Sequence, residues 1–129
     1  MLEQHDMVNY LNEIIGIEQA SFPICLVYTS PAFHGDLSCQ INFSYKNDQL
    51  EIEAAIPTPN NLAISASILE ANCGWADASL SWMYFCQEAQ SAALKTVCDP
   101  KLLTPDQLSL RVASFILACE KMRAVLDEA

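Results

Sequence analysis

The feature that most limits how this chain can fold is a strict alternation of apolar and polar residues between positions 37 and 45. The apolar positions are Leu37, Cys39, Ile41, Phe43 and Tyr45, and the polar positions between them are Ser38, Gln40, Asn42 and Ser44. Strand side chains point alternately to two faces, so this pattern predicts a strand with one buried and one solvated face. A turn at "KND" leads into a second alternating run, 50–54. The two runs predict a hairpin with one wet face.

A second strand-like segment, "SLSWMYFC" at 79–86, departs from this pattern. One side carries Leu80, Trp82, Tyr84 and Cys86, and the other carries Ser81, Met83 and Phe85. A solvated face of an antiparallel sheet is normally polar, and neither side of this segment is. Something therefore covers its second face, either the terminal helix of the same chain or another chain. After a turn at "QEAQS", residues 92–98 predict its partner strand.

Three segments have helical periodicity. In 2–15 the apolar residues recur at spacings of three and four, and Gly16 follows as a cap. The segment 60–72, "NNLAISASILEAN", is rich in small residues. The third helix is marked by Thr104 as N-cap, Pro105 at the first helical position and Gln107 completing a capping box. Its apolar face is Leu108, Val112, Phe115, Ile116, Cys119, Met122 and Leu126.

The order of these elements predicts the fold class. With the β-rich segment 23–29, the chain reads α-β-β-β-α-β-β-α. We expect an α+β fold with a mostly antiparallel five-stranded sheet and three helices. The length of 129 residues suits one domain, 1–129.

Charge limits the partners that such a surface can bind. The net charge is −10, from 16 acidic and 6 basic residues, and the first 45 residues contain no Lys or Arg. Nucleic acid and acidic membranes are therefore poor partners, because both require clustered cations. No apolar run approaches the length of a membrane helix, and the N-terminus has no secretory-signal pattern. We expect a cytoplasmic protein.

The six cysteines, at 25, 39, 73, 86, 98 and 119, do not form a metal-binding pattern. No two of them make a CxxC pair, and His5 and His34 are isolated. We expect no metal or cofactor, and reduced cysteines that pack as small apolar residues.

Catalytic motifs are also missing from the sequence. No serine lies in a G-x-S-x-G turn, and three widely spaced glycines cannot form a phosphate loop. Glu51 and Glu53 share a strand face, where an exposed polar face is the simpler interpretation than an acid–base pair. We therefore expect a binding protein and no enzyme.

Two stretches resemble the small acidic dimeric effector chaperones of type III secretion. "ILEANC" is similar to the end of that family's second helix, where an asparagine, here Asn72, follows two aliphatic residues. "LLTPDQLSLRVASFILACEKMRAVL" is similar to its closing segment, with Leu108, Phe115, Ala118, Arg123 and Leu126 at corresponding places. The order of elements matches along nearly the whole chain. The YbjN-like bacterial regulators resemble the chain in the same places.

The chaperone resemblance implies a dimer built from the second helix and the fourth strand. Carried onto this chain, the interface comprises Ile64, Ile68, Leu69, Trp82, Met83 and Tyr84. A two-fold interface uses one patch twice, and large aromatic residues supply much of its energy. We expect a homodimer, with a heterodimer as an alternative. The second chain would then cover residues 79–86.

The same resemblance implies a secreted effector protein as partner, held in an extended and partly unfolded form. The implied binding residues are Leu11, Ile15, Ile17, Leu26 and Tyr28, with Glu51 and Glu53 guiding a basic segment. Core packing is an alternative role for each of the apolar residues. Two further functions stay open: a YbjN-like regulator or adaptor that binds a folded partner, and a small-molecule binding domain walled by the aromatic stretch.

Overall fold

A computed structural model describes residues 4–16, 22–28, 39–58, 62–73, 81–88 and 90–127. The helices are α1 (Gln4–Ile15), α2 (Leu62–Cys73) and α4 (Pro105–Asp127), with a short 3-10 helix η2 (Pro100–Leu102). The strands are β1 (Ile24–Tyr28), β2 (Cys39–Lys46), β3 (Gln49–Pro57), β4 (Trp82–Cys86) and β5 (Ser91–Cys98). The expected α+β order is confirmed. The first residues expected in β2, β4 and α2 (37–38, 79–80 and 60–61) lie outside the described residues.

The five strands form one sheet in the order β1-β2-β3-β5-β4, and each neighbouring pair is antiparallel. The expected hairpin is β2–β3, with Phe43 opposite Ile52. Its turn residues Asn47 and Asp48 have φ values of 54° and 61°, in the left-handed region that Asn and Asp tolerate and that tight hairpin turns require. β5 returns beside β3, so that β4 takes the edge position opposite β1.

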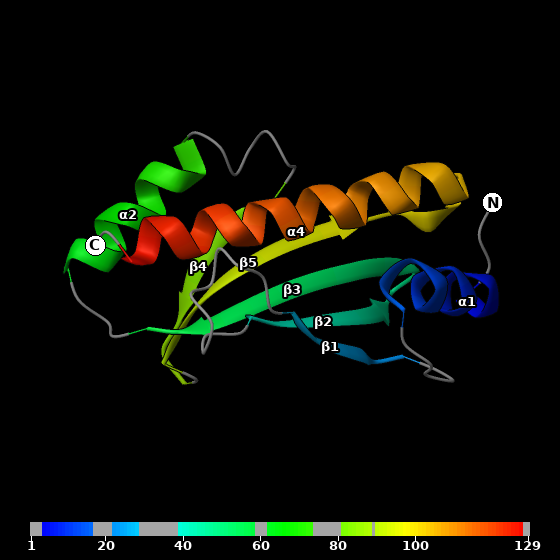
Figure 1. Cartoon of the computed structure of the whole chain (residues 1–129), viewed down its shortest axis with the longest axis horizontal. Coiled ribbons are helices and arrows are strands. Elements are labelled where there is room, and N and C mark those ends of the chain that lie inside the picture. The colour runs from blue at the N-terminus through cyan, green and yellow to red at the C-terminus, as the bar shows by residue number, and fades with distance from the viewer. Residues whose placement is uncertain are drawn as a thin grey trace.

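Within the described residues, α1, α2 and α4 pack on one face of this sheet. Figure 1 shows α4 running along the sheet, with α2 beside its C-terminal end and α1 near its N-terminal end. α4 contacts β5 and both other helices, and α2 contacts β4. The core therefore lies between one helical layer and one sheet.

A single cluster of buried side chains fills that space. The sheet contributes Ile41, Phe43, Leu50, Ile52 and Leu94; α1 contributes Met7 and Leu11; and α4 contributes Leu108, Phe115 and Cys119. These are the apolar positions of the alternating strands and of the periodic helix faces. The two periodicities thus define the buried faces, as expected from strand and helix geometry.

Local polar contacts fix the start and the position of α4. The Thr104 N–H donates to Gln107 Oε1 (2.9 Å), and the Gln107 N–H donates to Thr104 Oγ1 (3.2 Å), which confirms the expected capping box. Further along the helix, Arg111 Nη2 donates to Thr96 Oγ1 (2.8 Å) and to the Val97 carbonyl (3.2 Å) on β5. Thr96 is fully buried. Arg111 thus joins α4 to the sheet through a buried hydroxyl.

Candidate protein-binding surface

α2 covers one face of β4. Met83 lies opposite Leu94 on β5, and Phe85 lies opposite Ala92, so both side chains point to the helical layer. Met83 is buried, and Phe85 is half-buried against the core. Among the helix contacts of β4, the one with α2 is the largest, and the terminal helix α4 was the covering element that the sequence offered as an alternative to a second chain.

The other side of β4 belongs to the sheet face that points away from the helices, called here the outer face. Trp82, Tyr84 and Cys86 lie on it, since they alternate with Met83 and Phe85. Trp82 is 43% exposed, and Tyr84 and Cys86 are half-buried. A large aromatic side chain at an exposed sheet edge is a typical anchor for a protein interface.

The six residues assigned to a dimer interface occupy two different environments. Ile64, Ile68 and Met83 are buried in the core of this chain. Leu69, 68% exposed on α2, and Trp82 and Tyr84 on the outer face reach the surface. The buried three can therefore only support the positions of α2 and β4, and Leu69, Trp82 and Tyr84 remain for direct contact with another chain.

Asn72 joins α2 to the backbone of β4. Its Nδ2 donates to the Met83 carbonyl (2.9 Å), and the Met83 N–H donates to its Oδ1 (2.6 Å). β4 is an edge strand of the sheet, and the amide of Asn72 engages both of these backbone groups. A strand edge with unpaired N–H and C=O groups is a template for adding another strand. Asn72 occupies that template at Met83, the second residue of the strand.

A network of polar side chains crosses the outer face from β4 to β3. Lys95 on β5 makes an ion pair with Glu51 (Nζ–Oε1 3.4 Å), and the Tyr84 hydroxyl hydrogen-bonds with Glu53. Burial, that hydrogen bond and the nearby carboxylates raise the pKa of Tyr84 well above its usual range. The hydroxyl is therefore protonated at physiological pH and donates to Glu53. Both glutamates have partners here, where the sequence predicted an exposed polar face.

The small residue Ala93 makes room for this network. Tyr84 lies directly opposite Ala93, and Glu53 is on the next strand beyond. To reach Glu53, the Tyr84 side chain crosses β5 above Ala93, which is 1% exposed although it lies on the outer face. Trp82 stands opposite Lys95 in the neighbouring row. The outer face therefore presents an aromatic and charged surface held by fixed contacts.

The residues assigned to effector binding are also divided. Leu11 is fully buried in the core, so core packing is its role in this chain and it does not line a surface groove. Ile15 lies on α1, and Leu26 and Tyr28 lie on β1, but the structure does not describe the side chains of these three residues. Ile17 lies outside the described residues altogether. Glu51 and Glu53 are half-buried on the outer face.

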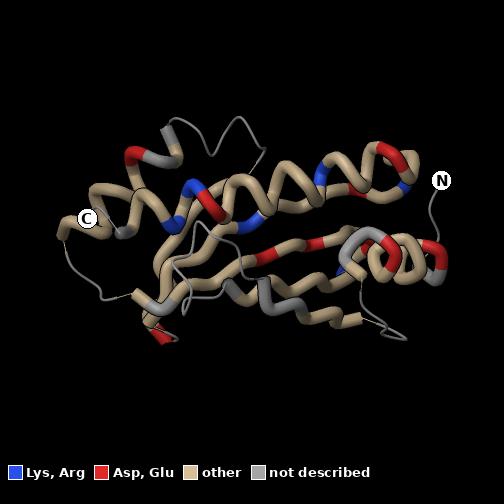
Figure 2. Tube along the Cα trace, viewed as in Figure 1, with Lys and Arg blue, Asp and Glu red and all other residues tan. Residues whose placement is uncertain are grey.

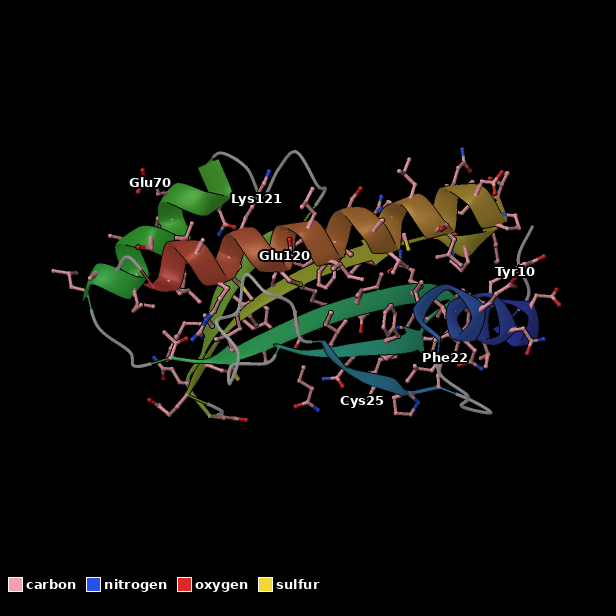
Figure 3. The ribbon with its side chains drawn as sticks, viewed as in Figure 1. Tyr10, Phe22, Cys25, Glu70, Glu120 and Lys121 are labelled. Carbon is pink, nitrogen blue, oxygen red and sulfur yellow. The ribbon has the colours of Figure 1, made fainter. Side chains whose placement is uncertain are left out.

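Three aromatic residues that the sequence argument did not select gather near α1 and β1. Tyr10, Phe22 and Tyr45 are partly buried against the core. The rings of Phe22 and Tyr45 stack with centroids 5.9 Å apart. Figure 3 shows Tyr10 and Phe22 at the same end of the molecule, near α1. Their half-exposed rings make an apolar surface there. Phe22 precedes a proline outside any periodic segment, so no pattern indicated it.

Two of the expected buried cysteines differ from expectation. Cys98 and Cys119 are buried, but Cys86 is half-buried and Cys25 is exposed, because both lie on the outer face. Burial raises the pKa of the Cys98 thiol, and the nearby positive charge of Arg111 offsets part of this increase.

Within the described part of the chain, no group of three or more His, Cys, Asp or Glu side chains could hold a metal ion. No helix in the described ranges has the length and apolarity that crossing a membrane requires.

Comparison with known proteins identifies the fold. No protein-family model and no curated protein sequence matches the chain. Among solved structures, a chain of the ExsC–ExsE complex aligns over 98% of this chain and 97% of its own, with a TM-score of 0.73 and 14% identity. A chain of the heterodimeric ExoU–SpcU complex from the type III secretion system of Pseudomonas aeruginosa aligns over 95% and 99%, with a TM-score of 0.64 and 9% identity.

YbjN, a putative transcription regulator from E. coli, aligns over 99% of this chain and 91% of its own, with a TM-score of 0.55 and 11% identity. At such identities the likeness shows the fold. Both resemblances expected from the sequence are thereby confirmed at that level. The chain has the α+β fold of one chain of the ExsC–ExsE complex, of one chain of the ExoU–SpcU complex and of YbjN.

Proposed function

We propose that this protein is a cytoplasmic secretion chaperone that binds an N-proximal segment of a type III effector and keeps it partly unfolded and competent for export. The observation that carries the proposal is the alignment with a chain of the ExsC–ExsE complex over nearly the full length of both chains. The neighbours are binding proteins, and we assign this chain a binding function without catalysis.

The described surface offers two kinds of contact for an extended segment. The half-buried aromatic rings of Tyr10, Phe22 and Tyr45 supply apolar area next to β1. β1 lies at one end of the sheet, so its edge can add a strand, whereas Asn72 already engages Met83, the second residue of the opposite edge strand β4. We therefore place the bound segment along α1 and β1, where Ile15, Ile17, Leu26 and Tyr28 remain its proposed contacts.

We further propose a homodimer in which Leu69, Trp82 and Tyr84 make direct contacts, with a heterodimer as the alternative. Leu69 and Trp82 are two of the large apolar side chains with high exposure. α2 and β4 are joined by Asn72, so the exposed residues of both move as one body. Such fixed apolar and aromatic groups suit a two-fold contact.

The second candidate function is a YbjN-like regulator or adaptor that binds a folded partner. It is favoured by the YbjN alignment, which spans 99% of this chain. The two functions differ in the state of the partner. A chaperone protects an otherwise unfolded segment, whereas an adaptor binds a domain that already resists proteases.

A tagged pull-down from the native host, followed by protease mapping of the recovered protein, tests the proposal. Recovery of a larger protein with only an N-proximal segment protected by this chain supports the chaperone function. Recovery of a partner that is equally protease-resistant alone supports the adaptor. A metabolite that raises the melting temperature, with no protein partner recovered, would instead support a small-molecule binding domain.

A further inference from the structure

α4 is apolar on two opposite sides. Its inner side enters the core through Leu108, Val112, Phe115, Cys119 and Met122. Its opposite side, called here the outer stripe, consists of Asp106, Leu110, Ala113, Leu117, Lys121 and Ala124, all exposed. With 100° between successive helical residues, these six fall within an arc of about 80°. The stripe is therefore a narrow, straight seam along the helix.

The two leucines of this stripe are among the most exposed large apolar side chains of the protein. Leu110 is 67% exposed and Leu117 is 54% exposed. They are seven residues apart, the spacing that places residues on one side of a helix and that coiled coils use for contact. They do not belong to α2, β4 or the outer face, so the proposed dimer contact leaves them uncovered.

The outer stripe is complementary to a second copy of itself that runs in the opposite direction. The midpoint between Leu110 and Leu117 is also the midpoint between Asp106 and Lys121, and it falls between Ala113 and Ser114. A second copy related by a two-fold axis at this point would place its Leu117 on Leu110. It would also place its Lys121 on Asp106. The axis repeats each of these contacts, which gives two leucine pairs and two opposite-charge pairs.

Charge selects this antiparallel arrangement. If two copies of α4 paired in parallel and in register, Asp106 of one copy would face Asp106 of the other, and Lys121 would face Lys121. Both of these like-charge pairs are repulsive. Figure 2 shows both basic and acidic positions along α4, and Figure 3 shows Lys121 on the side of α4 away from the sheet. Ala113 and Ser114 at the centre are small, so two helix axes can approach closely there.

We propose that the outer stripe of α4 binds the same stripe of a second copy in an antiparallel, two-fold contact. From Asp106 to Lys121 the contact spans about 22 Å of helix. One helix seam buries less area than the roughly 1,200 Å² of a stable interface, so the association is weak and depends on concentration. Combined with a separate dimer contact through α2 and β4, it joins dimers into larger assemblies.

Sedimentation velocity over a range of concentrations at low salt tests this inference. We expect the natural protein to show an association step that Asp106→Lys or Lys121→Asp weakens about tenfold in dissociation constant, because each change replaces two attractive pairs with two repulsive ones. The combined variant, Asp106→Lys with Lys121→Asp, is expected to restore the step. Only an antiparallel contact between identical stripes predicts that restoration.

Two controls separate this contact from general charge effects and from misfolding. Lys101→Asp and Glu88→Lys make the same charge changes at exposed positions outside the stripe and are expected to leave the step unchanged. Leu110→Ser is expected to abolish the step while the circular dichroism spectrum stays that of the natural protein. The inference is overturned if no such step exists, if the single charge variants associate like the natural protein, or if the combined variant fails to recover.

The proposed chaperone function is tested separately. Effector capture does not require the outer stripe, so the stripe variants are expected to recover the same partner in the pull-down. Loss of the partner in Leu110→Ser and Leu117→Ser, with no change in self-association, would mean that the stripe binds a different protein and would overturn the inference.

Discussion

Asn72 and Met83 form a two-bond pair in which one side-chain amide replaces a neighbouring strand. The amide donates to the Met83 carbonyl and accepts from its N–H, at 2.9 and 2.6 Å. A residue of α2 thereby satisfies both backbone groups that an edge strand would otherwise leave unpaired. Met83 of β4 and Ile68 of α2 also belong to the same buried core. Polar and apolar contacts thus both join α2 to β4.

Replacing Asn72 is expected to weaken the fold. Asn72→Ala leaves two partly buried backbone groups without their partner, and the loss of such hydrogen bonds costs about 1–3 kcal/mol. Urea unfolding measures the change in the free energy of unfolding. Asn9→Ala, at an exposed position of α1, is the matched control and is expected to change it little. Equal values for both variants would contradict the role given to Asn72.

Tyr84 is expected to make stability depend on alkaline pH. Its pKa is raised in the folded protein, so folding favours the protonated hydroxyl. The stability that the protonated Tyr84 hydroxyl contributes is fully present below the ordinary tyrosine pKa of about 10, and it is lost as the pH rises above that value. Tyr84→Phe lacks the hydroxyl, and at neutral pH we expect it to be less stable by about 0.5–1.5 kcal/mol.

The pH dependence of the difference between the two proteins is the measurement. Cys98 also titrates in alkali, but it is present in both proteins and cancels in their difference. We expect the stability advantage of the natural protein to shrink from pH 9 to 11. A constant advantage over this range would show that the Tyr84 hydroxyl contributes no linked stability.

Trp82 is expected to be required for the proposed dimer contact at α2 and β4. Trp82→Ser removes an aromatic side chain that is 43% exposed, so we expect loss of association with little loss of stability. Light scattering after size-exclusion chromatography reads the mass directly. Leu102→Ser removes a side chain that is 78% exposed on η2 and serves as control. A dimer that survives Trp82→Ser would place the contact elsewhere.

Glu51 is expected to affect how fast a basic partner segment binds. Glu51→Lys reverses one charge of the outer face and opposes Lys95, so we expect association with the captured partner to slow several-fold at low salt. Stopped-flow or surface binding kinetics at two salt concentrations measure this. Glu88→Lys gives the same change of net charge on the β4–β5 turn. If both variants slow binding equally, only net charge matters.

Cysteine reactivity is expected to follow exposure. Cys25 is exposed and Cys86 half-buried, whereas Cys98 and Cys119 lie in the core. Under native conditions we expect alkylation at Cys25 first, then at Cys86, with Cys98 and Cys119 protected. Peptide mass spectrometry with and without urea gives the order. Early modification of Cys119 would mean that α4 opens readily from the sheet.

The sequence predicted those parts of the fold that repeat with a fixed period. The alternation at Ile41 and Phe43 and the spacing of Leu108 and Phe115 identify buried faces without knowledge of tertiary structure. The capping box at Thr104 was predictable because it is local. These signals suffice for element order and fold class.

The candidate surface was less predictable because it depends on pairing between distant strands. The sequence placed Glu53 on a wet face, but only the register brings it within reach of Tyr84 across Ala93. The family resemblance selected Ile64 and Ile68 for a dimer interface, and the sequence could not tell whether these two side chains face the core or another chain. Asn72 was noticed through resemblance alone, and its bonds to Met83 required the structure.

The hydrogen bonds from Arg111 have a further consequence for α4. A purely apolar contact between a helix and a sheet tolerates sliding by one turn, about 5.4 Å, because leucine, valine and isoleucine are nearly interchangeable across it. Arg111 reaches a single hydroxyl, Thr96, and a single carbonyl, Val97, and a slide would break both bonds. These two bonds therefore select one axial setting of the helix among several of similar packing energy.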